Sequence, residues 1–178
     1  MTERKPGALE IAKRAWSWGD EALGHRELDR RAMALAIVVR GIFDQGGVSS
    51  ETFSEVLDVT PGAARELFDS LAAMGVERDE AGRITGAALT RRRTPHALRQ
   101  SMHEGERVLY AWCALDALFI PGLLNRTFEV ESRCPSNSAT IRLTVSGDGI
   151  ERSTPDDIWL SVFIPKSASN QIGPTTPT

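Results

Sequence analysis

The sequence has 178 residues, of which 41% are hydrophobic and 25% charged, and its formal net charge at pH 7 is −3. This composition is ordinary for a globular protein, and a slightly acidic chain has no general attraction for nucleic acid or anionic lipid. No apolar run reaches the length that spans a bilayer, and no apolar signal segment follows the first residues. We therefore expect a cytoplasmic protein with neither a membrane nor a nucleic acid as its partner.

Hydrophobic residues at helical spacing predict helices over about residues 9–74. They include a buried segment at 32–39, and the pair Gly46 and Gly47 ends that pattern. The first part of the chain is therefore predicted to be helical.

The next helix has the clearest boundaries. Thr60 and Pro61 supply an N-cap and a first-turn proline, and Gly75 supplies the stop. Residues 76–89 then predict a hairpin that turns near Ala81 and Gly82. Helices followed by such a hairpin predict a winged-helix-like domain over residues 1–90.

The second half changes to the periodicity of strands. Apolar and polar residues alternate over 128–132 and 141–145, which predicts half-buried strands. Residues 158–164 are more continuously apolar and predict a central strand. We expect an α+β protein, with a mixed β-sheet domain over residues 91–166, on which the helix that carries Cys113 is packed, and a disordered tail over 167–178.

The apolar run 110–121 places Cys113 and Asp116 three residues apart. On a helix these positions share a face, with Cβ atoms roughly 5–6 Å apart. A cysteine alone is most often a core residue. However, a carboxylate in an apolar helix is costly unless it finds a partner or stays protonated, and such groups gather at functional sites. We predict a buried pair that contacts a soft metal together with a group that needs a proton.

The second half also carries a specific motif pattern: LTRRRTPH at 89–96, LYAWCALDALFIP at 109–121, ESRC at 131–134 and IRLTV at 141–145. Over residues 89–150 the chain resembles the alkylmercury (organomercurial) lyases. The resemblance implies protonolytic cleavage of carbon–mercury bonds, giving a hydrocarbon and Hg(II), in mercury resistance and detoxification.

The residue types agree with that chemistry. A thiolate is the softest common side-chain ligand, so Cys113 is expected to bind the mercury of an organomercurial small molecule. Asp116 can take the thiol proton and deliver it to the carbon that leaves mercury. Tyr110 and Trp112 are expected to pack the core and, secondarily, to wall the organic group. Both catalytic roles thus fall within one short segment.

No organic cofactor is expected, because no glycine-rich loop of the kind that cradles phosphates is present. An external low-molecular-weight thiol is expected as co-substrate, carrying the organomercurial in and the product out. Hand-off of Hg(II) to a mercuric reductase is the expected next step.

The resemblance also implies a second cysteine beyond the central sheet, which shares the metal with the first. No cysteine follows Cys134 in this sequence, so we expect a truncated relative with impaired cleavage. The resemblance makes Cys134 structural. The alternative, that Cys134 replaces the second mercury ligand, stays open.

Two other classes of function remain. Cys113, with or without Cys134, could trap mercury without turnover. A winged helix could also read DNA, but the helix after Thr60 carries only Arg65 against Glu66 and Asp69. This charge balance disfavours contact with phosphates.

Overall fold

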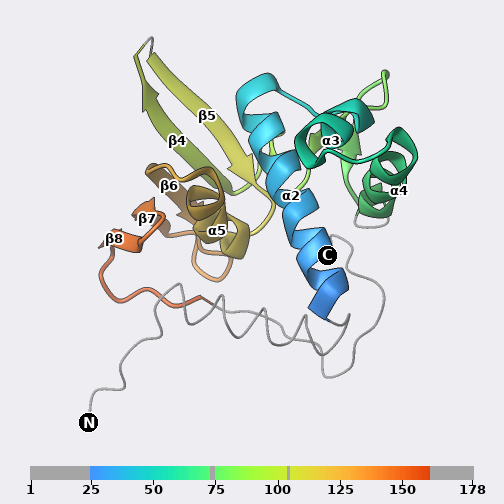
Figure 1. Ribbon diagram of the computed structural model, residues 1–178. Helices are drawn as coiled ribbons and strands as arrows, with labels where there is room; N and C mark the ends of the chain where they lie inside the picture. Colours follow the sequence, from blue (N-terminus) through green and yellow to red (C-terminus); the bar gives the residue numbers. More distant parts are fainter. Residues whose placement is uncertain (1–24, 73–74, 104, 161–178) are drawn as a thin grey trace.

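The computed structural model describes residues 25–72, 75–103 and 105–160 (Figure 1). The helices are α2 (His25–Gln45), α3 (Ser50–Leu57), α4 (Pro61–Ala72) and α5 (Ala114–Leu124). The strands are β1 (Glu77–Arg78), β2 (Ile84–Gly86), β3 (Leu89–Thr90), β4 (His96–Met102), β5 (Gly105–Ala111), β6 (Phe128–Arg133), β7 (Thr140–Ser146) and β8 (Gly149–Thr154). None of the helices in these ranges is long and apolar enough to cross a membrane.

The predicted helical pattern is confirmed over residues 25–72, and residues 9–24 and 73–74 of that prediction lie outside the described residues. Helix α2 ends at Gln45, and Gly46 follows with a φ of +79°, a conformation that glycine adopts without strain. The Thr60 hydroxyl accepts a hydrogen bond from the Ala63 backbone N–H at 3.3 Å, as expected of the N-cap of α4. Strands β1 and β2 form the predicted hairpin. The Asp79 carboxylate closes its turn by accepting hydrogen bonds from the backbone N–H groups of Ala81 and Arg83.

Six strands form the main sheet in the order β3-β5-β4-β6-β7-β8. This architecture confirms the α+β class. Every described pairing in the sheet is antiparallel, whereas we expected a mixed sheet. The reason lies in the connections, because short turns join β4 to β5, β6 to β7 and β7 to β8, and short turns reverse the chain direction.

The predicted central strand at 158–164 is corrected in part. Residues 158–160 lie outside any strand, and the central positions belong to β4 and β6. Residues 161–164 and the predicted tail at 167–178 lie outside the described residues. The sequence reasoning did not predict three strands, which are the hairpin partners β4 and β5 and the edge strand β8.

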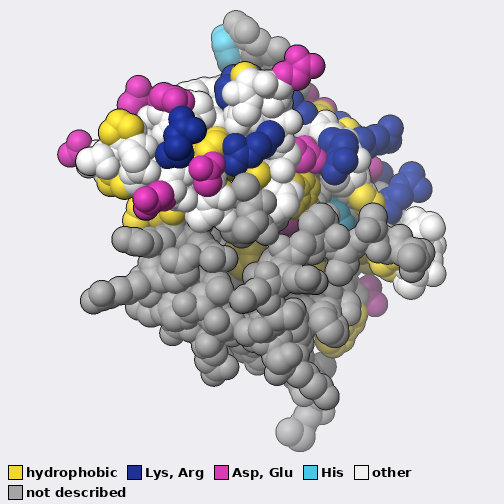
Figure 2. All heavy atoms as spheres, turned by 90° about the vertical axis from the view of Figure 1, so that its right-hand side faces the viewer, with side chains coloured by type: hydrophobic (Ala, Val, Ile, Leu, Met, Phe, Trp, Pro, Cys, Tyr) yellow, Lys and Arg dark blue, Asp and Glu magenta, His cyan; other side chains and the backbone are white. Residues whose placement is uncertain are grey.

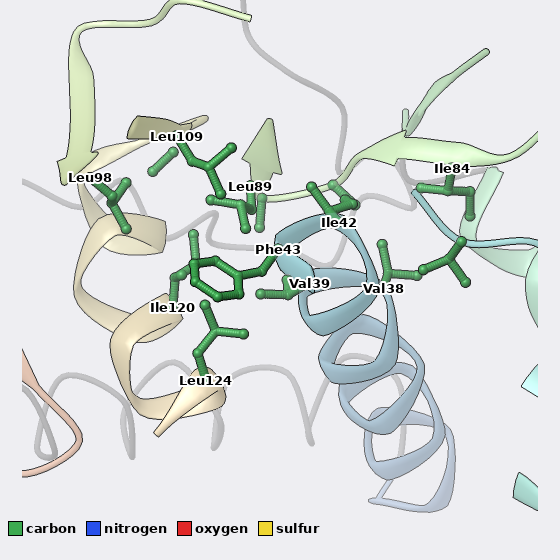
Figure 3. Packing of buried hydrophobic residues seen from close by; sticks show 14 of the residues in the cluster. Val38, Val39, Ile42, Phe43, Ile84, Leu89, Leu98, Leu109, Ile120 and Leu124 are labelled. Carbon is green, nitrogen blue, oxygen red and sulfur yellow. The ribbon is translucent and has the colours of Figure 1, made fainter. Parts of the chain in front are cut away.

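The buried core is continuous between the two halves of the chain. Phe43 of α2 packs edge-to-face on Phe128 of β6, with ring centroids 5.9 Å apart. Figure 3 shows Phe43 pointing from α2 toward Ile120 and Leu124 of α5. Helix α5 is thus held between α2 and the sheet. The division into domains at residues 1–90 and 91–166 stays a prediction.

Candidate active site at the start of helix α5

Cys113 lies between the end of β5 and the first turn of α5, where it is the N-cap residue with an extended backbone (φ −141°, ψ 169°). Its sulfur accepts a hydrogen bond from the Asp116 backbone N–H at 3.4 Å. In return, the Asp116 carboxylate accepts the Cys113 backbone N–H at 3.1 Å. This reciprocal pair is a capping box, in which each side chain satisfies one free N–H of the helix start. The predicted proximity of the two side chains is confirmed.

The burial of the pair differs from the expectation. Cys113 is exposed and Asp116 is half-buried, whereas we expected both to be buried. The N-cap position explains the difference, because it places the thiol at the helix end and leaves the apolar contacts to the following turns. Those turns bury Ala117, Ile120 and Leu124. A substrate can therefore reach the sulfur from solvent, while the acid lies one turn deeper.

The environment of the pair favours its protonated forms. Atoms packed around the sulfur partly desolvate it, and this desolvation together with the neighbouring Asp116 charge raises the pKa of Cys113 to about 11. Desolvation also raises the pKa of Asp116, and it outweighs the hydrogen bonds from Cys113 that favour the carboxylate. The direction agrees with an acid that holds a proton for later transfer.

A raised pKa of Cys113 predicts slow reaction with a neutral alkylating agent at neutral pH. Only the thiolate attacks iodoacetamide, so the rate at which Cys113 is alkylated should rise about tenfold per pH unit between about pH 8 and 10. Hydrogen bonds from the Ser136 hydroxyl and the local backbone lower the pKa of Cys134, so its rate should level off earlier. Mass spectrometry of the two alkylated peptides measures both rates in one sample.

Replacing Asp116 with Asn removes the neighbouring charge and should shift the Cys113 rate profile to lower pH. A Cys113 rate that levels off at or below the pH at which Cys134 does would contradict the assigned environment.

The two aromatic candidates lie differently with respect to Cys113. Trp112 precedes Cys113 directly, and its indole Nε1 is buried without a hydrogen-bond partner in the described structure. Tyr110 alternates with the buried residues Leu109 and Ala111 along β5, so it lies on the sheet face opposite α5. The structure therefore confirms that Trp112 packs against the hydrophobic core, and it places Tyr110 across the sheet from α5.

Cys134 does not join Cys113. It follows β6 and lines a cavity together with Tyr110 and Arg133, and that cavity includes neither Cys113 nor Asp116. Within the described ranges, no three His, Cys, Asp or Glu side chains gather in a way that could hold a metal ion. The described part of the site thus offers one thiol.

One polar pair at this end of the sheet was not predicted. His96 of β4 and Ser132 of β6 face each other in register, with His96 Nδ1 2.9 Å from Ser132 Oγ. Ser132 is buried, and burial lowers the pKa of His96. His96 lies two residues before the buried Leu98 on β4, so both side chains point to the face that α5 covers. This two-residue spacing was the signal in the sequence that could have predicted the position of His96.

Comparison with known proteins identifies relatives of this chain. The alkylmercury lyase family profile matches residues 89–174. The chain is 37% identical over 124 residues to an alkylmercury lyase of Streptomyces lividans, covering 69% of this chain and 54% of that protein. It is 40% identical over 96 residues to one of Pseudomonas putida, covering 54% of this chain and 43% of the relative.

The chain thus spans about half the length of the curated relatives that it matches. A solved structure described as the mercury-bound form of MerB2 has the same fold, with a TM-score of 0.53 at 22% identity. That match covers 69% of this chain and 60% of the other. Cys113, Asp116, Trp112 and Cys134 all lie within the segment that the family profile matches. By sequence, residues 89–174 of this chain match the alkylmercury lyase family.

Proposed function

We propose that this protein is an organomercurial lyase, which cleaves carbon–mercury bonds by protonolysis. The observation that carries the proposal is the reciprocal pairing of an exposed thiol with a half-buried acid at the start of α5. Its relatives over this segment are named alkylmercury lyases. The pair supplies the two groups that the reaction needs, a soft ligand for mercury and a proton donor for carbon.

The reaction begins with exchange of thiols on mercury. A substrate of the form R–Hg–SR′ meets Cys113, its sulfur bonds to mercury, and the small thiol R′SH leaves. Because the pKa of Cys113 is about 11, the thiol is protonated at neutral pH. Its proton must be released as the sulfur–mercury bond forms, and the Asp116 carboxylate and the departing thiolate are the available acceptors.

Protonolysis follows. The Asp116 carboxyl gives its proton to the carbon bonded to mercury, the carbon–mercury bond breaks, and a hydrocarbon R–H leaves with Hg(II) still bound to sulfur. The raised pKa of Asp116 suits this step, since a carboxyl that is protonated near neutral pH is the better donor. The buried edge of Trp112 can wall the organic group. External low-molecular-weight thiols then remove Hg(II), for hand-off to a mercuric reductase in the cytoplasm.

Mercury binding without turnover is the second candidate, and the placement of Cys134 favours it. Two sulfur ligands on mercury weaken the carbon–mercury bond more than one, and the described site offers only Cys113. Loss of one ligand or electrostatic partner at a reacting centre commonly costs about 10²–10³ in rate. Turnover by these 178 residues is therefore expected to be slow.

A DNA-binding role has less support. Arg65, Glu66 and Asp69 are all exposed on α4, and Asp69 lies 3.9 Å from Arg78 of the hairpin. Figure 2 shows basic and acidic side chains interspersed over the face that carries α3 and α4. A surface of mixed sign does not attract a phosphate backbone. A gel shift with random-sequence duplex at low salt tests this class directly.

The test of the proposed function is benzene release from phenylmercury in the presence of excess thiol, followed by gas chromatography. We expect a slow but Cys113-dependent release above the rate of thiol alone. Uptake of one mercury per protein with no benzene released would support the binding function instead. If the protein neither takes up mercury nor releases benzene, both proposed functions are excluded.

A further inference from the structure

A cavity of about 520 Å³ opens on the sheet face opposite α5. Its floor is a row of three neighbours in register, Tyr110 of β5, Ala97 of β4 and Glu131 of β6. The small Ala97 side chain between two larger ones leaves the hollow. Thr94 and Pro95 border it before β4, and Cys134 and Pro135 border it after β6.

This cavity is separate from the Cys113 site. Along β4, the buried Leu98 faces α5, whereas Ala97 and Arg99 alternate with it and face the other way. The sheet itself therefore stands between the cavity and α5. Neither Cys113 nor Asp116 lines the cavity.

The cavity is positively charged in a chain whose net charge is −3. Three arginines line it, Arg93, Arg99 and Arg133, against the single acid Glu131. Arg99 is paired with Glu106 at 3.0 Å, and Glu131 is paired with Arg142 at 3.3 Å. In the described ranges neither Arg93 nor Arg133 forms an ion pair. Two guanidinium groups are thus free to bind carboxylates, for which their fork geometry is suited.

The cavity also has a thiol at its rim. Cys134 is partly exposed, is not in a disulfide, and its sulfur lies 3.0 Å from the Ser136 hydroxyl. Hydrogen bonds from Ser136 and the backbone of Asn137 lower the pKa of this thiol. The thiolate is the form of cysteine that attacks disulfides.

We propose that this cavity binds small organic carboxylates, and that Cys134 at its rim forms a mixed disulfide with a carboxylate-bearing low-molecular-weight disulfide bound there. Arg93 and Arg133 hold the carboxylates, and Tyr110 provides an apolar wall. The cavity is a site of reversible S-thiolation apart from the chemistry at Cys113.

The exchange is balanced without another reactant. The Cys134 thiolate attacks one sulfur of the symmetric disulfide RSSR, a bond forms between Sγ and that sulfur, and the RS–SR bond breaks. The second half leaves as the thiolate RS⁻ and takes a proton from solvent. The Cys134 sulfur is oxidised, and the departing sulfur is reduced.

The test compares three disulfides at about 0.15 M salt, where distant charges are screened. These are glutathione disulfide, which bears carboxylates, neutral hydroxyethyl disulfide and cationic cystamine. The protein is the full chain with Cys113→Ser, so that Cys134 is the only thiol. Intact-mass spectrometry follows the rate of mixed-disulfide formation. We expect glutathione disulfide to react about tenfold or more faster than the neutral disulfide, and cystamine to react slowest.

Arg133→Gln and Arg93→Gln should each slow the reaction with glutathione disulfide several-fold and leave the neutral reagent unchanged. Ala97→Leu, which fills the floor of the cavity, should slow glutathione disulfide as well. The matched control is Arg65→Gln, which makes the same charge change on the exposed face of α4.

Equal rates for the three disulfides, or an equal effect of Arg65→Gln and Arg133→Gln, would overturn the proposal. The readout is independent of carbon–mercury cleavage, so the proposed lyase function stands or falls separately. If a variant is misfolded, as judged by its thermal unfolding, the comparison of the three reagents on the Cys113→Ser chain still decides the question.

Discussion

In the presence of competing small thiol, which removes phenylmercury from the partly exposed thiol of Cys134, replacing Cys113 with Ser is expected to abolish stoichiometric binding of phenylmercury. A serine hydroxyl is a harder ligand and is far less acidic than a thiol, so it does not bond to mercury at neutral pH. Changes to residues that only support a metal ligand already cost about 10- to 100-fold in affinity, and loss of the ligand itself should cost more. Uptake can be measured by mercury analysis after removal of unbound reagent.

The matched control is Cys134→Ser, which removes the other thiol of the sequence. Because Cys134 lies in the cavity on the opposite sheet face, this variant should keep one strongly bound phenylmercury per chain. If the Cys113 variant and the parent took up equal amounts in the presence of competing thiol, Cys113 would not be the mercury ligand.

Replacing Asp116 with Asn is expected to leave phenylmercury binding largely intact and to reduce benzene release by about 10²–10⁴, the usual contribution of a positioned proton donor. The amide keeps the size of the carboxyl and an oxygen that can accept the Cys113 backbone N–H. It cannot deliver a proton. Single-turnover release of benzene from the preformed complex isolates this step from binding.

An acid elsewhere on the surface provides the control for Asp116. Asp44 is exposed on α2, so Asp44→Asn removes the same charge without touching the capping box. Unchanged benzene release by the Asp116 variant would exclude Asp116 as the proton donor. A loss of release that is matched by the Asp44 variant would point to a general effect of charge.

Much of the local structure followed from the sequence, because its causes are local. Thr60 and Pro61 begin α4, Gly46 follows the end of α2, and Asp79 closes the hairpin turn. Helix caps, glycines in the left-handed conformation and acidic residues in turns each depend only on residues that are near in the sequence. The spacing of Cys113 and Asp116 is of the same kind, and the sequence predicted their contact for that reason.

Other features depended on contacts between distant segments. The segment 158–160 is apolar but lies outside any strand, whereas the polar-rich β4 lies at the sheet's centre between β5 and β6. Strand order depends on which partners are available, and hydrophobicity alone does not encode it. The exposure of Cys113 likewise follows from its place at the junction of β5 and α5.

By itself, the sequence determined the residue types that can do mercury chemistry and the local pairing of thiol and acid. Only the tertiary structure decided that Tyr110 lies across the sheet from α5, since the alternation of side chains on paired strands assigns each residue to a face. It also decided that Cys134, which follows the end of β6, lines the cavity on that face. The same pairing brought Arg93 and Arg133, forty residues apart in sequence, to one cavity. Strand register, which no single segment specifies, is the physical reason for both.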